Sequence, residues 1–308
     1  MSSAFDFAAA SGRGHGKIIL LGEHAVVHGR PALAAGLPQG VDIRLLGAGP
    51  GERRVPAGVD ARLEEVLRLA ARLGGLPDEL GLALQIEGDL PIAVGLGSSA
   101  ALAVALVRAL AAGSSEALDD TQVAARANQI EAIFHGRPSG IDVTTAARGG
   151  VLHFRMGPPL EHRMLALGRS LDFLLIDTGT QHSTATTVGS LAERAAASPA
   201  THAPLFDAIG TLAEFAETCL LHGEVHGLGE AMTMNHGLLR TLGVSTEELD
   251  AAVAAALACG ALGAKLTGAG GGGVVLALLG PESEGLAEAL AARGYTTRTA
   301  RLAAGAAA

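Results

Sequence analysis

Three glycine-rich loops, each entered from an apolar run, constrain most strongly how this chain can fold. They are KIILLGEHAVVHG (residues 17–29), LPIAVGLGSSAA (residues 90–101) and KLTGAGGGG (residues 265–273). Glycines let backbone amides crowd around an anion where a Cβ atom would block approach. The middle loop opens into a helix-forming run, and a helix that begins at Ser98 and Ser99 offers free N–H groups and the positive end of its dipole. Together the loops predict a mixed helix-and-sheet protein that handles phosphate groups.

Composition limits the partners that such a protein can have. The 308 residues are enough for two domains, and a formal net charge of −9 argues against nucleic acid or an anionic membrane as the main partner. Only two cysteines are present, which fits a reducing cytosol. We see no signal peptide at the N-terminus and no apolar run near the roughly 20 residues that a membrane helix needs. We therefore expect a cytoplasmic protein that acts on small molecules.

Hydrophobic periodicity predicts a β-rich early half and a helix-rich later half. Strands are expected at residues 18–21, 82–86, 151–154, 173–176, 274–279 and 296–301. Helices are expected at residues 62–73, 98–112, 119–135, 186–197, 205–221, 228–239, 246–258 and 284–292. A stretch with proline and glycine at residues 155–168 is the expected boundary. The prediction is an α+β protein with an N-terminal nucleotide-binding domain at residues 1–165 and a C-terminal domain at residues 166–308.

The GLGSS loop has an ordinary interpretation beside the phosphate one. It lacks the lysine of a P-loop and does not form the G-x-G-x-x-G pattern of a dinucleotide site. Alone, it could be a tight strand-to-helix turn with serine caps. The two other glycine loops favour phosphate binding.

Three charged residues are candidates for the chemistry. Lys17 precedes an apolar strand and could be a surface lysine, but a compact cation there suits a reacting phosphate. Glu131 could form an exposed helical pair with His135; alternatively, one glutamate and a serine hydroxyl would suffice for Mg²⁺. Asp142, in PSGID, could cap a short helix or accept the proton of a substrate hydroxyl during phosphoryl transfer.

The histidines of HAVVH leave one further alternative. His24 and His28 have the spacing of metal ligands, but the glutamate of H-E-x-x-H is missing and Gly22 favours a loop over a helix. A zinc hydrolase is therefore a distant alternative.

Longer segments of the chain resemble the GHMP kinase superfamily and, within it, the mevalonate kinases. The central motif is seen as PIAVGLGSSA (residues 91–100), and the C-terminal glycine-rich motif as residues 265–273. The stretches KIILLGEHAVVHGRPALA and HGRPSGIDVTTAARGG are similar to mevalonate kinase segments. The resemblance covers nearly the whole chain. It implies a two-domain α+β fold with the active site in the inter-domain cleft, and ATP- and Mg²⁺-dependent phosphorylation of (R)-mevalonate to 5-phosphomevalonate in isoprenoid biosynthesis.

The resemblance also implies a role for individual residues. Asp142 would be the catalytic aspartate, Lys17 would polarise the substrate hydroxyl, and Ser99 and Glu131 would ligate Mg²⁺. The nucleotide would be held by Gly95, Leu96, Gly97, Ser98, Ser99, Ala269 and Gly270. Mevalonate would be faced by Glu23, His24 and Thr184.

Some positions depart from the pattern of the family, and some alternatives stay open. Ile92, Ala93, Val143 and His182 replace residues that are frequent in relatives. A phosphomevalonate or homoserine kinase, or a non-catalytic nucleotide-binding relative, is the alternative function. The sequence leaves the oligomeric state open, a homodimer included.

Overall fold

The computed structural model divides the chain into two compact units, which are described separately. The residues described are 5–90, 95–136, 138–157, 160–180 and 184–305. Unit 1 comprises Met1–Lys17, Pro38–Pro91 and Gly97–Gly149; unit 2 comprises Ile18–Leu37, Ile92–Leu96 and Gly150–Ala308. The long strands β1 (Ser11–Leu21) and β2 (Pro31–Gly47) contribute residues to both units. Helices and mainly antiparallel sheets confirm the α+β class. The predicted boundary after residue 165 stays a prediction.

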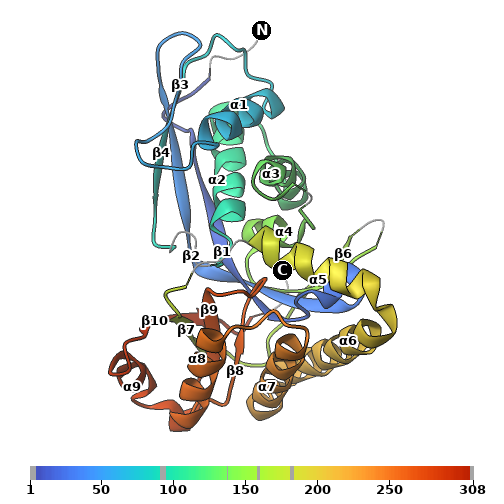
Figure 1. Cartoon of the computed structure of the whole chain (residues 1–308). Helices are drawn as coiled ribbons and strands as arrows, with labels where there is room; N and C mark the ends of the chain where they lie inside the picture. The colour runs from blue at the N-terminus through green and yellow to red at the C-terminus, as the bar shows by residue number, and fades with distance from the viewer. Residues whose placement is uncertain (1–4, 91–94, 137, 158–159, 181–183, 306–308) are drawn as a thin grey trace. The chain divides into compact units, whose positions relative to one another are not determined.

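Unit 1 is a sheet with helices on one face (Figure 1). The later part of β2 pairs antiparallel with β4 (Leu82–Gly88), which pairs in parallel with β3 (Arg53–Arg54). The helices are α1 (Leu63–Leu73), α2 (Ser98–Gly113), α3 (Asp120–His135) and α4 (Ile141–Arg148). The alanine-rich α2 is buried along most of its length, because small side chains let α3 and α4 pack closely against it.

Helix α3 has a capping residue at each end, and these residues determine where the helix begins and ends. Asp119 accepts a hydrogen bond from the Gln122 amide, and the Gln122 side chain accepts one from the Asp119 amide, which is a capping box. The helix ends at Gly136, as predicted, with φ of 67°. The helix therefore brings Glu131 and His135, one turn apart, to its C-terminal end.

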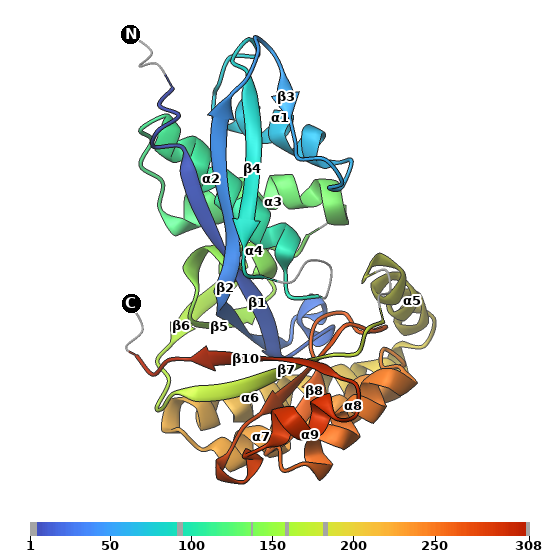
Figure 2. The ribbon, with the colours of Figure 1, turned by 90° about the vertical axis from the view of Figure 1, so that its left-hand side faces the viewer.

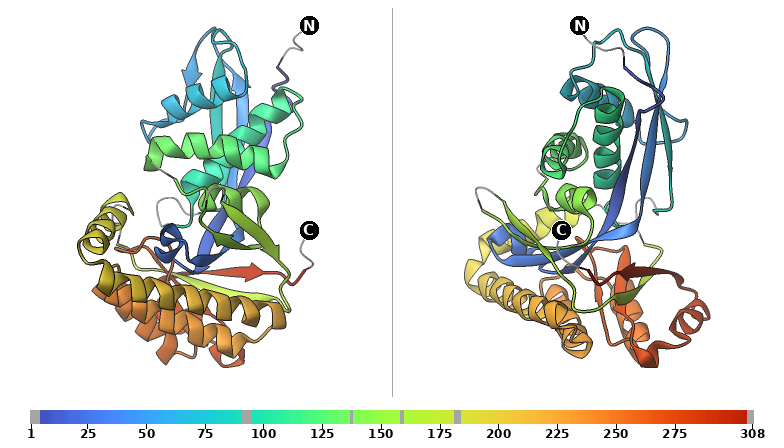
Figure 3. Two further views of the ribbon diagram at one scale, coloured as in Figure 1. Left: turned by 90° about the vertical axis from the view of Figure 1, so that its right-hand side faces the viewer. Right: turned by 180° about the vertical axis from the view of Figure 1, so that it is seen from behind.

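Unit 2 contains a four-stranded antiparallel sheet in the order β10-β7-β9-β8. These strands are β7 (Leu171–Asp177), β8 (Gly263–Leu266), β9 (Val274–Leu278) and β10 (Thr296–Leu302). Helices α6 (Pro199–His222), α7 (Val225–Thr241) and α8 (Glu247–Ala258) lie along one side of this sheet (Figures 2 and 3). The remaining elements are η1 (Ala25–His28), β5 (Val151–Arg155), β6 (Glu161–Leu165), α5 (Thr184–Ala197), η2 (Pro281–Ser283) and α9 (Leu286–Ala291).

The structure differs from the predicted elements at several points. Strand β6 lies in the stretch that was predicted as a boundary, where its backbone pairs with β5 despite its polar sequence. Helix α6 begins at Pro199, before the predicted start, and carries Pro204 inside it. Strand β8 is not among the strands expected from the sequence, although an apolar run was noted before the last glycine loop. Among the described helices, none is both long and apolar enough to cross a membrane.

Candidate active site

Lys17 and Asp142 form an ion pair in unit 1. Lys17 lies on β1 and is 5% exposed, so its ammonium group is largely withdrawn from water. Its Nζ atom lies 3.3 Å from Asp142 Oδ1. Asp142 is the second residue of α4, which begins after Gly140 in the left-handed conformation. The Asp142 side chain is 40% exposed, so its carboxylate can meet a substrate.

Gly97 packs directly against the Lys17 side chain. It precedes α2 with φ of 74°, and a Cβ atom built there would lie 2.6 Å from Lys17 Cγ. Glycine is therefore required both by the backbone conformation and by the close approach. Within the part of the chain that the structure describes, no side chain caps the start of α2, so the amides of Ser98 and Ser99 have no such partner there.

Ser99 and Glu131 meet at the start of α2 and the end of α3. The Ser99 hydroxyl donates a hydrogen bond of 2.8 Å to Glu131 Oε1, and His135 Nε2 lies 3.2 Å from the same oxygen. Burial raises the pKa of Glu131 to about 7, and the negative charge of Asp142 also raises it, while the Ser99 hydrogen bond lowers it. Glu131 Oε2 is buried and has no hydrogen-bond partner among the described residues. An unmatched buried carboxylate oxygen beside a hydroxyl fits a hard cation such as Mg²⁺.

A second buried network holds the loop after β1 in unit 2. Lys265 on β8 is completely buried, and its ammonium group forms an ion pair with Glu23 Oε1. The ammonium also donates to the carbonyls of Leu266 at 2.6 Å and Ile19 at 3.4 Å. Glu23 Oε2 accepts a hydrogen bond of 3.0 Å from the Asn235 side chain. Both carboxylate oxygens of Glu23 are therefore engaged inside the unit.

The residue after Glu23 has a strained backbone. His24 has φ of 60° and ψ of −43°, and the Ala25 amide donates a 2.6 Å hydrogen bond to the Glu23 carbonyl. This is a γ-turn of the rare form with positive φ. Such a conformation costs on the order of 1–3 kcal/mol in a residue other than glycine and persists only where its surroundings enforce it. The engaged carboxylate of Glu23 supplies part of that enforcement.

The side chain of His24 supplies a second anchor for the turn. Its Nε2 atom lies 2.9 Å from the carbonyl oxygen of Ala269 in the C-terminal glycine loop. That loop is itself fixed, because the Gly271 amide donates to the Val244 carbonyl at 2.8 Å and Thr267 bonds to the backbone of Ile19. A Cβ atom at Gly270 would lie 2.1 Å from the Val244 carbonyl oxygen, so no other residue fits there.

The structure groups the predicted residues within each unit. In unit 1, Lys17 and Asp142 are paired, and Ser99 contacts Glu131. In unit 2, His24 contacts Ala269. Residues 91–94 and His182 lie outside the described residues. Thr184 begins α5, but its side chain also lies outside the description. Gly95 and the buried Leu96 belong to unit 2.

Two buried partners were not among the predicted site residues. Lys265 was noted only as the first residue of a glycine loop, and Asn235 was not singled out. The sequence GAKL carries one signal, because it places a lysine inside an apolar strand. If both faces of the strand are covered, the ammonium group of that lysine needs a buried hydrogen-bond acceptor.

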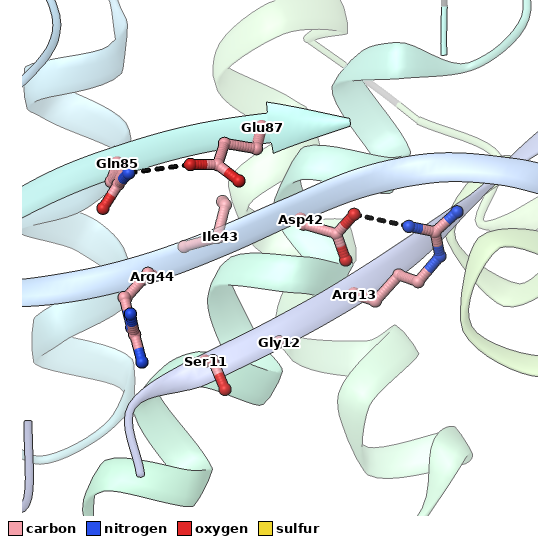
Figure 4. A pocket seen from close by; sticks show the side chains of 8 residues that line it. All are labelled: Ser11, Gly12, Arg13, Asp42, Ile43, Arg44, Gln85 and Glu87. Carbon is pink, nitrogen blue, oxygen red and sulfur yellow. Dashed lines mark hydrogen bonds and ion pairs between the residues drawn. The ribbon is translucent and has the colours of Figure 1, made fainter. Parts of the chain in front are cut away.

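A hollow of about 360 Å³ on the sheet of unit 1 contains none of the predicted residues (Figure 4). It is lined by residues of β1, β2 and β4, and its charged side chains include Arg13, which is paired with Asp42. Gln85 donates to Glu87 at 2.8 Å. Four of the polar lining groups are therefore engaged with one another, and none of the lining residues is a predicted site residue.

Comparison with known proteins identifies the family. The family model described as "GHMP kinases N terminal domain" matches residues 61–150. The model described as "GHMP kinases C terminal" matches residues 214–296. The chain belongs to the GHMP kinase family. As a GHMP kinase it uses ATP. The first match contains Ser99, Glu131 and Asp142, and the second contains Lys265 and Ala269.

Curated relatives of this GHMP kinase are named mevalonate kinases. The protein from Pyrococcus abyssi is 32% identical over 316 residues, which are 93% of this chain and 93% of the relative. The protein from Archaeoglobus fulgidus is 37% identical over 271 residues, or 85% of this chain and 90% of the relative.

Solved structures agree with the sequence relatives. L. major mevalonate kinase in complex with R-mevalonate matches with a TM-score of 0.89 and 29% identity over 100% of both chains. A Streptococcus pneumoniae phosphomevalonate kinase matches with a TM-score of 0.80 but 17% identity, over 94% of this chain and 99% of that one. That second likeness concerns the fold alone.

The contact between Gly97 and Lys17 generates a testable prediction. Gly97→Ala should lower kcat, because the new methyl group displaces the lysine that pairs with Asp142. Gly75→Ala is the matched control: Gly75, also in unit 1, has a positive φ, of 68°, but a Cβ atom there meets nothing within 4 Å. Both changes strain the backbone by about 1–2 kcal/mol. Equal losses of kcat in the two variants would show that Lys17 is not displaced.

The buried pair in unit 2 generates a second prediction. Lys265→Met should lower the free energy of unfolding by roughly 3–5 kcal/mol, because it leaves the Glu23 carboxylate buried without its cation. The double variant Glu23→Gln with Lys265→Met should recover part of that loss, since it removes the unpaired charge and keeps an oxygen for Asn235. Urea unfolding measures both. A double variant no more stable than Lys265→Met would contradict this account.

Proposed function

We propose that the protein phosphorylates (R)-mevalonate on its primary hydroxyl with ATP and Mg²⁺, giving 5-phosphomevalonate. Membership of the GHMP kinases supports a kinase that acts on an alcohol, and relatives that are 32–37% identical are named mevalonate kinases. The observation that carries the proposal is the pairing of Lys17 with Asp142. A carboxylate and a buried ammonium so placed can orient a hydroxyl and neutralise charge at the phosphoryl group.

The chemistry assigns one step to each residue of the pair. Asp142 accepts a hydrogen bond from the primary hydroxyl and takes its proton as the oxygen attacks the γ-phosphorus atom of ATP. The bond from the γ-phosphorus to the bridging oxygen breaks, and ADP leaves. Lys17 holds the carboxylate in place and offsets negative charge that develops on the transferred group. The uncapped start of α2, after Gly97, is suited to binding phosphate oxygens.

Ser99 and Glu131 are the residues proposed to hold Mg²⁺. Their oxygens are adjacent, and Glu131 Oε2 is a buried atom without a partner among the described residues. When bound, the ion would neutralise phosphate charge. Gly95, Leu96, Ser98, Ala269 and Gly270 are proposed to contact the nucleotide. His24 and Thr184 are proposed to contact mevalonate, while the engaged oxygens of Glu23 favour a supporting role for that residue.

A panel of alcohols tests the function directly. The purified protein is incubated with ATP, Mg²⁺ and mevalonate, phosphomevalonate or homoserine, and ADP release is followed while phosphorus NMR identifies the product. We expect the highest kcat/KM with mevalonate and a phosphate ester on its primary oxygen. Faster turnover of phosphomevalonate or homoserine would overturn the substrate assignment. The cytoplasmic location and a homodimer stay predictions.

The role of Asp142 predicts the behaviour of its amide variant. Asp142→Asn should lower kcat by about 10²–10⁴-fold, because asparagine cannot accept the hydroxyl proton. The Kd for ATP, measured by calorimetry, should stay close to that of the unchanged protein. A variant that keeps a tenth of the original kcat would exclude Asp142 as the catalytic aspartate.

The role of Glu131 predicts a change in metal affinity without loss of folding. Glu131→Gln should weaken Mg²⁺ by roughly tenfold or more, equivalent to at least about 1.4 kcal/mol. Binding of Mn²⁺, followed by electron paramagnetic resonance, gives a readout that is independent of turnover. Without metal, the variant should unfold at the same temperature or higher, because the amide oxygen can still accept from Ser99 and no buried charge remains. Unchanged metal binding would make Glu131 a structural residue only.

A further inference from the structure

The side chain of Arg108, on α2, joins this helix to three other elements of unit 1. Its Nη1 atom donates a hydrogen bond of 2.7 Å to the carbonyl oxygen of Arg13 on β1. Its Nη2 atom donates at 2.7 Å to Asp120 Oδ1, at the start of α3, and at 2.7 Å to the carbonyl oxygen of Ala147, in the last turn of α4. One guanidinium group therefore connects α2 with β1, α3 and α4.

Each of these four elements also carries a residue of the candidate active site. In the order β1, α2, α3 and α4, these residues are Lys17, Ser99, Glu131 and Asp142. Helices and paired strands move as rigid elements, so a shift at the point where they meet displaces the side chains that they carry elsewhere. The contacts of Arg108 thus bear on the geometry of the whole site in unit 1.

The contact between β1 and α2 shows why a fixed point is needed there. Gly12 and Gly14 stand on either side of Arg13, and a Cβ atom at Gly14 would lie 2.0 Å from the carbonyl oxygen of Ala101 on α2. The backbones of strand and helix are therefore in direct contact. Interdigitating side chains normally fix how two elements are aligned, and glycines provide none. The hydrogen bond from Arg108 to the Arg13 carbonyl supplies the missing alignment.

Arginine suits this position better than any other cation of the chain could. Its planar group presents several N–H donors in fixed directions, whereas the ammonium of lysine is a compact charge on a flexible stem. The Ala147 carbonyl lies in the last turn of α4, where the helix supplies no amide partner and a positive charge is favourable. A lysine at position 108 could serve only some of the three acceptors.

We infer that Arg108 is a positioning residue for phosphoryl transfer: by fixing β1 and α4 against α2, it sets the spacing between Lys17 and Asp142, whose charged atoms lie 3.3 Å apart. This inference rests on the proposed function, because it concerns the step assigned to that pair. Arg108 acts on the reaction through these two residues and not by contact with a substrate.

A pair of matched variants tests the inference. Arg108→Lys keeps the charge and removes the planar group. Arg126→Lys is the control, since Arg126 on α3 donates to both carboxylate oxygens of Glu116, at 2.6 and 2.7 Å. The two arginine side chains are similarly covered, with 28% of Arg108 and 27% of Arg126 exposed. Glu116 lies between α2 and α3, so the control pair does not join β1 or α4.

The expected result is a selective loss of kcat. Arg108→Lys should lower kcat by roughly tenfold to a hundredfold, because a misplacement of about 1 Å is enough for such a loss. Its Kd for ATP should change little, and Arg126→Lys should keep a kcat close to that of the unchanged protein. An unchanged kcat in Arg108→Lys, or equal losses in the two variants, would overturn the inference.

A third variant covers the case in which Arg108→Lys does not fold. Asp120→Ala removes one of the three acceptors from a side chain that is 46% exposed. It should lower kcat by a smaller factor, because the contacts of Arg108 with β1 and α4 remain. If Arg108→Lys cannot be purified and Asp120→Ala turns over as fast as the unchanged protein, the inference is wrong.

A second background separates positioning from a general loss of structure. Arg108→Lys is also combined with Asp142→Asn, in which the carboxylate that Arg108 is inferred to position is already absent. Residues that act as a unit are not additive, so Arg108→Lys should have little further effect there. If it lowers kcat by the same factor in both backgrounds, Arg108 does not act through Asp142 and the inference fails.

The choice of alcohol keeps this test apart from the test of the proposed function. All rates are measured with whichever of mevalonate, phosphomevalonate and homoserine the unchanged protein uses best, so a wrong substrate assignment leaves the comparison intact. Failure of the unchanged protein to phosphorylate any of the three would overturn the proposed function, and the role of Arg108 in that reaction would fall with it.

Discussion

A lysine ammonium group that is sealed from water must find an acceptor for each of its protons, and Lys265 does so within unit 2. Its acceptors come from Glu23, Ile19 and Leu266, so one side chain ties the end of β1 and the following loop to β8. Asn235 on α7 completes the arrangement through the second oxygen of Glu23. The position of His24 depends on this network, because the network holds the side chain of Glu23, the residue that begins the turn.

Unit 1 contains the opposite arrangement of buried charge. Glu131 is nearly as inaccessible as Lys265, yet one of its oxygens has no partner among the described residues. Burial of that carboxyl is the main reason that its pKa rises to about 7. In unit 2 the buried ammonium of Lys265 and the carboxylate of Glu23 satisfy each other, whereas in unit 1 the buried carboxyl of Glu131 keeps an oxygen that is suited to the proposed cation.

Local signals in the sequence predicted much of this arrangement, and tertiary burial accounts for what they missed. The start of α2 at Ser98 and the cap of α3 are determined by residues close in the sequence. The sequence pattern therefore predicted both. Lys17 and Asp142 were selected by residue type, and the structure pairs them. Burial of Lys265 could not be read from GAKL, because it depends on both faces of β8 being covered. Strand β6 was missed because its polar sequence carries no alternation, and its register is set by β5.

The backbone conformation of His24 costs stability that a glycine at the same position would not cost. Glycine would adopt φ of 60° without the steric penalty that histidine incurs there, and it would still permit the bond between the Ala25 amide and the Glu23 carbonyl. A library of variants selected for heat resistance alone would therefore enrich glycine at this position, whereas the proposed contact of His24 with the substrate would retain the imidazole under selection for turnover. At position 24, selection for stability and selection for the proposed function therefore favour different residues.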